Sequence, residues 1–209
     1  MLCDPCLMFA YGTFKSKEEI RRVFFALQVD NFPTLNVLQE GTELTRHEVR
    51  RALNFLQGAG LVWGNGCCGL SESGRRLLEL LRDADQQPEP SETLCDDCLL
   101  EISEFLPADG YTVLAQLSSR AAHSRHDLIV STAITSARLQ DVLRILDGAQ
   151  LIQSGRGRFF RLSETGRRLE RLLHRRQRAS QWDSARVSQS PGSREPLLSL
   201  SIVKGGREL

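Results

Sequence analysis

Four cysteines occur as two pairs with the spacing of metal ligands. The segment LCDPCL near the N-terminus contains Cys3 and Cys6, and the segment LCDDCL contains Cys95 and Cys98. A Cys-x-x-Cys turn supplies two thiolates from one short stretch, and a tetrahedral zinc site takes four ligands. The second pair begins eighty-nine residues after Cys6, whereas common zinc motifs separate their pairs by about 15–20 residues. We expect one structural zinc at these four cysteines if the two segments pack together.

Three other roles suit the same cysteines. The pairs could form a redox-sensing dithiol, hold an iron–sulfur cluster, or pack as small apolar side chains on a helix. The segment CDDCLLEISEFL is expected to be helical from Asp96 or Asp97, which keeps the packing role open. Cys67 and Cys68 fall in a predicted strand, where packing is expected. The N-terminus lacks the pattern of a signal peptide, so the six cysteines indicate thiols or metal ligands in a cytoplasmic protein.

The cysteine pairs belong to an internal repeat. The phrase LNFLQGAGLV at 53–62 resembles LRILDGAQLI at 143–152, and LSESGRRLLELL at 70–81 resembles LSETGRRLERLL at 162–173. These phrases and the cysteine pairs recur in the same order at offsets of ninety to ninety-two residues. Duplication of a unit explains this pattern. The predicted division of the chain is a first unit at 1–83, an acidic linker at 84–93, a second unit at 94–178 and a disordered tail at 179–209.

The first unit has the order of a helix-turn-helix domain followed by a hairpin. Ser16 with Glu19, and Thr45 with Glu48, form capping-box patterns that each start an amphipathic helix, with a short helix between them. The segment LVWGNGCCGL predicts two short strands around a tight turn. The phrase LSESGRRLLELL is expected to form a closing helix that is capped by Ser71 and whose arginines face solvent.

These sequence motifs and their order resemble those of the MarR/PadR-type winged-helix regulators. In that family a recognition helix leads into a Leu-x-x-x-Gly-Leu-Val exit, then a wing, then a Leu-Ser/Thr-x-x-Gly-Arg entry to the last helix. Both units carry these pieces, at roughly 16–83 and 110–176, with Gln150 in place of the second exit glycine. The resemblance implies a mainly α fold with small β-hairpin wings, in the α+β class, arranged as two tandem winged helix-turn-helix domains. It also implies a DNA-binding transcriptional regulator, although winged helices serve as protein-interaction modules too.

The outer face of the helix at 45–57 is suited to reading double-stranded DNA. A recognition helix presents this face to the major groove, and arginine and amide side chains make bidentate contacts with guanine and adenine. With the apolar residues turned to the core, five candidates fall on the outer side: Arg46, His47, Arg50, Asn54 and Gln57. We expect this helix to supply sequence recognition.

The second unit is more basic in its wing than in its recognition helix. The helix offers Arg138 beside acidic residues, whereas the wing SGRGRFFRL carries Arg156, Arg158 and Arg161. Residues 155–178 contain nine arginines against two glutamates, so a net charge of +1 conceals a basic region. Arginine-bearing wings bind the phosphate backbone or the minor groove. We therefore expect this wing to hold DNA mainly through charge.

Missing patterns exclude other function classes. The chain has no Gly-rich phosphate loop, no GxSxG and no HExxH motif, and the cysteine pairs lack the strand–helix–strand context of thioredoxin-like enzymes, so no enzyme is expected. No apolar run reaches about 18 residues, so no membrane contact is expected. A tandem winged-helix adaptor that binds protein partners is the alternative function, and the acidic linker favours it. A homodimer formed through the terminal helices also stays open.

Overall fold

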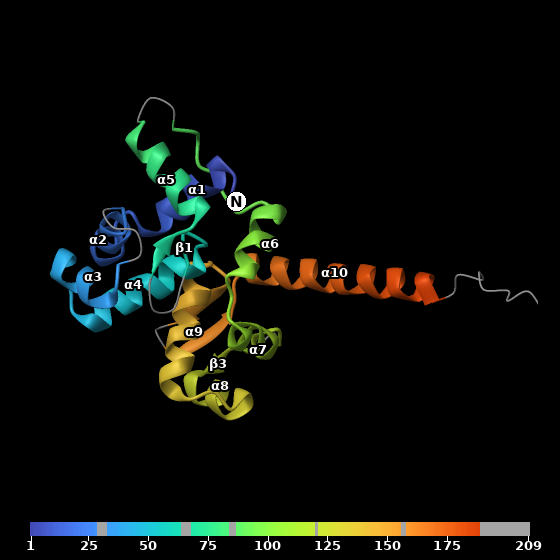
Figure 1. Ribbon diagram of the computed structural model, residues 1–209. Helices are drawn as coiled ribbons and strands as arrows, with labels where there is room; N and C mark the ends of the chain where they lie inside the picture. Colours follow the sequence, from blue (N-terminus) through green and yellow to red (C-terminus); the bar gives the residue numbers. More distant parts are fainter. Residues whose placement is uncertain (29–32, 64–67, 84–86, 120, 156–157, 189–209) are drawn as a thin grey trace, which may run out of the picture. The chain divides into compact units, whose positions relative to one another are not determined.

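The structure is a computed structural model that describes residues 1–28, 33–63, 68–83, 87–119, 121–155 and 158–188. Within this part the protein is mainly helical, with ten helices and two small antiparallel sheets (Figure 1). The mainly α class with small sheets is therefore confirmed. Residues Met1–His174 form one compact unit that contains both halves of the repeat, and the remainder of the last helix belongs to a second unit that starts at Arg175.

The first half contains five helices and one hairpin. In chain order its elements are α1 (Asp4–Phe14), α2 (Glu18–Ala26), α3 (Leu35–Thr42), α4 (Arg46–Gly58), β1 (Val62–Trp63), β2 (Gly69–Leu70) and α5 (Glu72–Arg82). The strands β1 and β2 pair antiparallel, with Val62 opposite Leu70. The predicted turn GNG at 64–66, and Cys67 of the predicted second strand, lie outside the described residues.

The second half repeats this order and adds one short strand. Its elements are α6 (Asp96–Glu104), α7 (Ala108–Leu117), β3 (His123–Ser124), α8 (Arg125–Thr132), α9 (Ser136–Gly148), β4 (Ile152–Gly155), β5 (Phe159–Leu162) and α10 (Glu164–Ser188). In the three-stranded sheet β5 lies between β3 and β4. Helix α10 continues beyond residue 178, where the tail was predicted to begin. No helix in the described ranges has both the length and the apolar character that crossing a membrane requires.

Helix starts follow the predicted caps at two of three positions. Thr45 closes a full capping box at α4, and the Ser71 hydroxyl accepts a backbone hydrogen bond at the start of α5. The capping box predicted at Ser16 is wrong, because α2 begins without a side-chain cap. Glu19, the expected partner in that box, instead forms an ion pair with Arg51 of α4. A contact between helices has thus replaced the local one.

Helices α4 and α9 cross at the centre of the compact unit (Figure 1). The two backbones touch at a pair of glycines that are equivalent in the repeat. A Cβ atom on Gly58 would lie 1.8 Å from the Ile145 carbonyl oxygen, and one on Gly148 would lie 2.0 Å from the Phe55 carbonyl oxygen. Phe55 and Ile145 are themselves buried. The two halves therefore share one core through these helices.

The turns that follow α4 and α9 both contain a residue with a left-handed backbone conformation. Gly60 has a φ of +71°, and its repeat counterpart Gln150 has a φ of +57°. Glycine adopts this conformation freely, whereas a residue with a side chain pays about 1–2 kcal/mol for it. The second exit still closes with the same backbone bond as the first, from Leu151 N to Leu146 O at 2.9 Å. The exit geometry is thus retained without the glycine.

Replacing Gln150 by glycine should raise the free energy of unfolding by about 0.5–1 kcal/mol, because relief of the left-handed backbone outweighs the added freedom of the unfolded chain. The substitution gives up one exposed bond from Gln150 Nε2 to Asp147 O, at 3.0 Å. Urea unfolding at constant m-value measures the change. The reciprocal Gly60→Gln variant should be destabilised. Equal stability of Gln150→Gly and the parent protein would contradict the prediction.

Candidate metal centre

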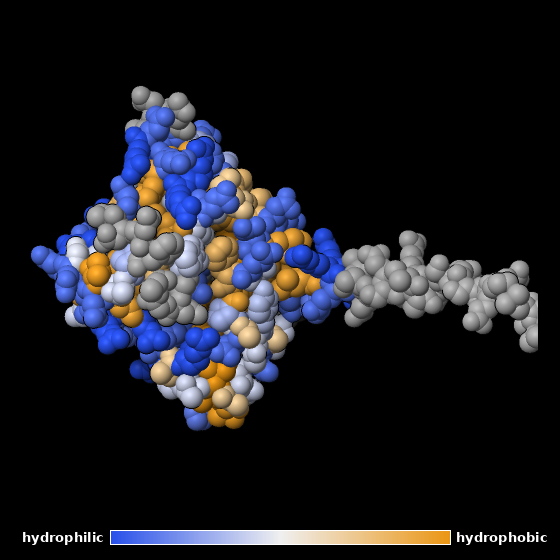
Figure 2. Space-filling view, in the orientation of Figure 1, coloured by the Kyte–Doolittle hydropathy of each residue, from blue (hydrophilic) through white to orange (hydrophobic). Residues whose placement is uncertain are grey.

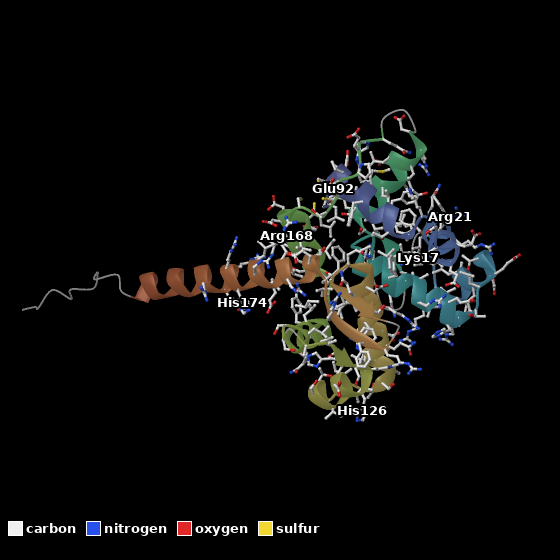
Figure 3. The ribbon with its side chains drawn as sticks, turned by 180° about the vertical axis from the view of Figure 1, so that it is seen from behind. Lys17, Arg21, Glu92, His126, Arg168 and His174 are labelled. Atoms are coloured by element: carbon white, nitrogen blue, oxygen red, sulfur yellow. The ribbon has the colours of Figure 1, made fainter. Side chains whose placement is uncertain are left out.

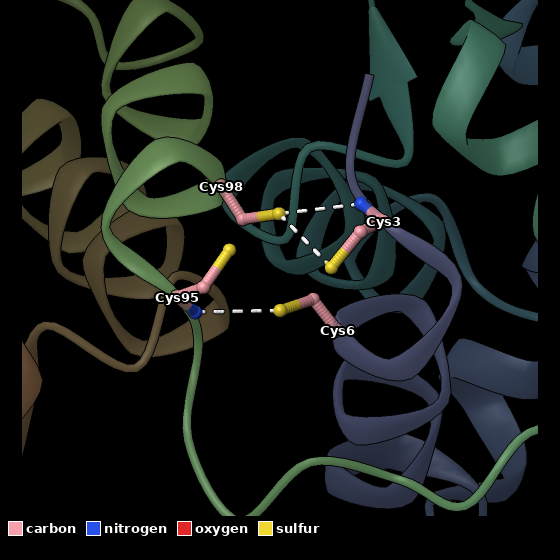
Figure 4. Close-up of side chains that lie close together, drawn as sticks. All are labelled: Cys3, Cys6, Cys95 and Cys98. Carbon is pink, nitrogen blue, oxygen red and sulfur yellow. Dashed lines mark hydrogen bonds between the residues drawn. The ribbon is translucent and has the colours of Figure 1, made fainter.

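The four cysteines of the repeated pairs converge in the fold. The sulfur atoms of Cys3, Cys6, Cys95 and Cys98 all lie within 4.8 Å of one another (Figure 4). In a tetrahedral site with metal–sulfur bonds of about 2.3 Å, neighbouring sulfurs are roughly 3.8 Å apart. The segments therefore pack together as the sequence prediction required, and the four thiols are close enough to hold a metal ion.

Two helix starts position these sulfurs. Cys3 and Cys95 are the N-cap residues of α1 and α6, and neither side chain caps its own helix through a hydrogen bond. Cys6 and Cys98 are buried on the first turn of the same helices. Each pair thus wraps the positive end of a helix dipole, which favours an anionic thiolate over a neutral thiol.

Backbone hydrogen bonds cross between the two halves in a reciprocal pattern. Cys3 N donates to Cys98 Sγ at 3.2 Å, and Cys95 N donates to Cys6 Sγ at 3.3 Å. The Sγ atoms of Cys98 and Cys3 are 3.6 Å apart (Figure 4). Backbone N–H groups that donate to sulfur orient a ligand and stabilise its charge. Each half therefore supplies two sulfurs and also supports a sulfur of the other half.

The thiols of Cys6, Cys95 and Cys98 differ in their tendency to ionise. Burial raises the pKa of the Cys6 and Cys98 thiols. At Cys95, burial acts in the same direction, but hydrogen bonds from Cys98, Cys6 and Cys3 outweigh it and lower the pKa. A bound cation is the agent that would deprotonate all four, because metal charge stabilises coordinated thiolates directly.

An arginine of each closing helix, α5 and α10, contacts the segment that carries a cysteine pair. Arg76 of α5 makes a bidentate ion pair with Asp4, at 2.7 and 3.0 Å, and this guanidinium lowers the pKa of the Asp4 carboxyl. In the second half Arg168 of α10 donates to Asp96 at 2.5 Å and to the Leu94 carbonyl at 2.7 Å (Figure 3). Each aspartate lies between the two cysteines of its pair. Arg75 and Arg76 were both expected to face solvent; Arg75 is exposed, but the expectation is wrong for Arg76, which pairs with Asp4.

The sequence contained a signal for these ion pairs. Asp4 and Asp96 are separated by ninety-two residues, and so are Arg76 and Arg168. Two charged positions that recur at the same offset as the cysteines indicate a contact between the two segments that is repeated in each half. The Cys-Asp-x-Cys turn and the Gly-Arg-Arg helix start therefore form one structural module, which occurs once in each half.

The predicted DNA-reading residues at the start of α4 are exposed. Arg46 has no ion-pair partner among the described residues. Arg50 forms an ion pair with Asp141 of α9 at 3.3 Å, and His47 Nε2 lies 3.2 Å from an Arg144 nitrogen. Two of these three side chains therefore face the second half of the protein as well as solvent.

The two amide side chains further along α4, Asn54 and Gln57, form hydrogen bonds with the second half of the protein. Asn54 Nδ2 donates to the Asp141 carboxylate at 2.9 Å, and Gln57 Nε2 donates to the Phe105 carbonyl at 3.4 Å. Both side chains are half-buried between the halves. Base reading by Asn54 and Gln57 would require these bonds to break. The structure therefore does not place all five predicted residues on one free face.

In the second half, the arginines of the wing are more available to a partner than Arg138 of α9. Arg138 is exposed but forms an ion pair with Asp109 of α7 at 2.6 Å. Arg158 and Arg161 are exposed, and no described carboxylate pairs with either. Arg156 lies outside the described residues. The described wing therefore presents two arginines whose charge is not neutralised by the protein.

No protein-family model and no curated protein match the chain. The crystal structure of the DIP2311 protein from Corynebacterium diphtheriae is similar at 19% sequence identity and a TM-score of 0.28, over 73% of this chain and 27% of that one. The chain thus spans 27% of that protein's length.

Proposed function

We propose that the protein is a DNA-binding tandem winged-helix protein, acting as a transcriptional regulator, whose two halves are joined by one structural zinc ion. The basic wing of the second half supports the DNA-binding part, and the cluster of four thiols supports the zinc. The repeated order of a three-helix group, a hairpin and a closing helix is that of the winged-helix regulators that the sequence resembles.

Zinc is the metal that suits this site best. Thiolate ligands favour zinc, copper(I) and iron–sulfur clusters over harder cations. A set of four sulfurs, with no position left for a reacting molecule, is typical of a structural zinc site. Elemental analysis of the purified protein should give one zinc per chain, and cobalt should replace it with the absorption spectrum of tetrahedral thiolate coordination. Iron with acid-labile sulfide would overturn the assignment in favour of a cluster.

The observation that carries DNA binding is the exposed wing of the second half. No carboxylate in the described part of the chain pairs with Arg158 or Arg161, and Phe159 between them is 51% exposed on β5. Arginines that neutralise phosphates provide sequence-independent affinity, and an apolar side chain beside them suits insertion between base steps in a minor groove. The start of α4, with Arg46 exposed and unpaired among the described residues, supplies a second contact.

Replacing Arg158 and Arg161 by glutamine should weaken binding to a random-sequence duplex and make it less salt-dependent. Each lost phosphate contact should reduce the slope of log affinity against log salt by roughly 0.9. Fluorescence anisotropy between about 50 and 200 mM salt measures both changes. The matched control replaces Arg21 and Arg22, which are exposed on α2 and paired with Glu18. An equal loss in the control would show general charge attraction instead of a wing contact.

A protein-binding adaptor is the second candidate. Helices α4 and α9 bury part of their outer faces against each other, which leaves less of α4 free to enter a DNA groove. Helix α8 carries Val130, which is 69% exposed. Figure 2 shows apolar atoms on the surface at the end of the molecule where α8 lies in Figure 1. Exposed apolar side chains of this kind are common in protein interfaces. A folded, zinc-loaded protein that shows no duplex binding at low salt would favour this function over the first.

A further inference from the structure

A cleft in the second half lies where the end of α7, strand β5 and the first turns of α10 meet, and we name it the wing cleft. It has a volume of about 550 Å³. Arg161 of β5 and Arg167 and Arg171 of α10 line it. Among its described lining residues, Glu170 is the one carboxylate. Three guanidinium groups from two elements therefore border one cavity.

The arginines of the wing cleft carry more positive charge than the nearby carboxylates neutralise. Glu164 lies 3.3 Å from Arg171 and 3.8 Å from Arg167, so one carboxylate serves two guanidinium groups. Arg161 donates from Nε to the Gln153 amide oxygen at 3.2 Å, and no carboxylate in the described ranges pairs with it. With the carboxylate of the lining counted as well, three positive charges face two negative ones. All three arginines are exposed, and because exposed ion pairs contribute at most about 1 kcal/mol, an incoming anion can displace them.

Two serine hydroxyls also line the wing cleft. Ser118 and Ser119 follow the last residue of α7, and both are exposed. The Ser118 hydroxyl donates to the Ala115 carbonyl at 2.7 Å, and the Ser119 oxygen lies 2.6 Å from His123 Nε2. A serine hydroxyl can rotate and donate to a new acceptor in place of these bonds. Arginine and serine side chains are among the groups that contact phosphate in protein–DNA complexes, so this lining suits a phosphate group.

The repeat shows that the fold does not require arginine at two of these three positions. At the offset of ninety-two residues, the first half has, in the order of the three cleft arginines, Gly69, Arg75 and Glu79. Strand β2 still pairs with β1 there, and helix α5 still forms. The next position along the closing helices behaves differently, because Arg76 and Arg168 both pair with an aspartate of a cysteine turn. The additional arginines thus belong to the half that carries the basic wing, and not to the architecture that both halves share.

We propose that the wing cleft binds a phosphate group of a nucleic-acid backbone, through Arg161 of the wing and through Arg167 and Arg171 of α10. Guanidinium groups hold phosphate by charge-assisted hydrogen bonds. The inference rests on the proposed function and extends it, because it adds the closing helix of the second half to the surface that contacts DNA. Phosphate contacts fix the position and orientation of a protein on a duplex without reading its sequence. The cleft would therefore set how the wing approaches the DNA.

A matched pair of single variants tests this contact. Arg167→Gln and Arg75→Gln remove the same charge from equivalent, exposed positions of the two closing helices. Fluorescence anisotropy with a random-sequence duplex, between about 50 and 200 mM salt, measures the slope of log affinity against log salt. This slope should be smaller by roughly 0.9 in Arg167→Gln and in Arg171→Gln, and unchanged in Arg75→Gln. Glu170→Gln should strengthen binding, because it removes a negative charge that repels the phosphate.

Equal slopes in Arg167→Gln and Arg75→Gln would overturn the inference, and the proposed function would stand if the wing variants still lose affinity. Inorganic pyrophosphate is the probe for a free ligand, titrated calorimetrically into the full-length, metal-loaded protein at constant ionic strength. If the protein binds no duplex but binds pyrophosphate, and Arg167→Gln weakens that binding, the cleft belongs to a free phosphorylated molecule. That result would overturn both the nucleic-acid source and the proposed function. Thermal unfolding without any anion verifies that each variant is folded.

Discussion

Replacing Cys3 and Cys95 together by serine is expected to abolish metal binding and to lower the free energy of unfolding by about 4 kcal/mol at zinc concentrations near a thousandfold above Kd. For a protein of this size that loss corresponds to a fall in Tm of about 8–16 °C. The variant removes one sulfur from each half and leaves Cys6 and Cys98 in place. The magnitude is large because the metal binds only the folded arrangement, in which the two pairs meet.

Chelation should reproduce this loss in the parent protein and have no further effect on the variant. Acidification should act in the same direction, because protons displace the metal from thiolates and the stability it provides is lost as pH falls. Cys68→Ala is the matched control, since Cys68 is buried outside the cluster, and it should retain the metal. If a reductant lowers the Tm of the parent protein and a chelator does not, a disulfide between the pairs would be the correct assignment.

Replacing Gly58 by alanine should lower the free energy of unfolding by about 3 kcal/mol. The added Cβ would lie 1.8 Å from the Ile145 carbonyl oxygen, so α4 and α9 must move apart along their contact. Overpacking against backbone, which cannot rotate away, is among the more destabilising of single changes. Gly148→Ala should cost a similar amount, because its Cβ would lie 2.0 Å from the Phe55 carbonyl oxygen.

The same experiment includes an internal control and a test of coupling. Gly12 in α1 and Gly41 in α3 have no atom within 4 Å of an added Cβ, so alanine at either helical position should stabilise the protein by about 0.5–1 kcal/mol. The double variant at Gly58 and Gly148 should lose less than the sum of the two single losses, because one separation of the helices accommodates both methyl groups. Stabilisation by Gly58→Ala would show that α4 and α9 do not touch.

The convergence of the four cysteines was predictable because they carry their own pattern in the sequence. Two Cys-x-x-Cys pairs at equivalent places in a repeat predict that the segments meet about a local twofold axis, and the four sulfurs are close in the structure. The caps at Thr45 and Ser71 were predictable for a similar reason, since a cap is satisfied within a few residues of chain. Local chemistry and repeat spacing thus determined these features from sequence alone.

The contact between α4 and α9 was not predictable from helical periodicity. The spacing of Val49, Leu53 and Leu56 identifies one apolar face, and the polar residues opposite it were assigned to solvent and DNA. Polar side chains can instead satisfy one another across a helix crossing, as Asn54 does with Asp141. Phe55 was the clue to this second buried face, because a large aromatic side chain on an outer face needs a covering element.

The division of the cysteine ligands between the halves has an evolutionary consequence. A single copy of the repeat carries only two sulfurs, so it would complete a four-sulfur site by pairing with an identical copy about a true twofold axis. Fusing two copies into one chain makes that association intramolecular and frees each half to change independently. The two halves differ at equivalent positions: Gln150 stands where the first half has Gly60, and Phe159 and Phe160 stand where it has Cys67 and Cys68. Two identical copies in a symmetric dimer could not differ in this way.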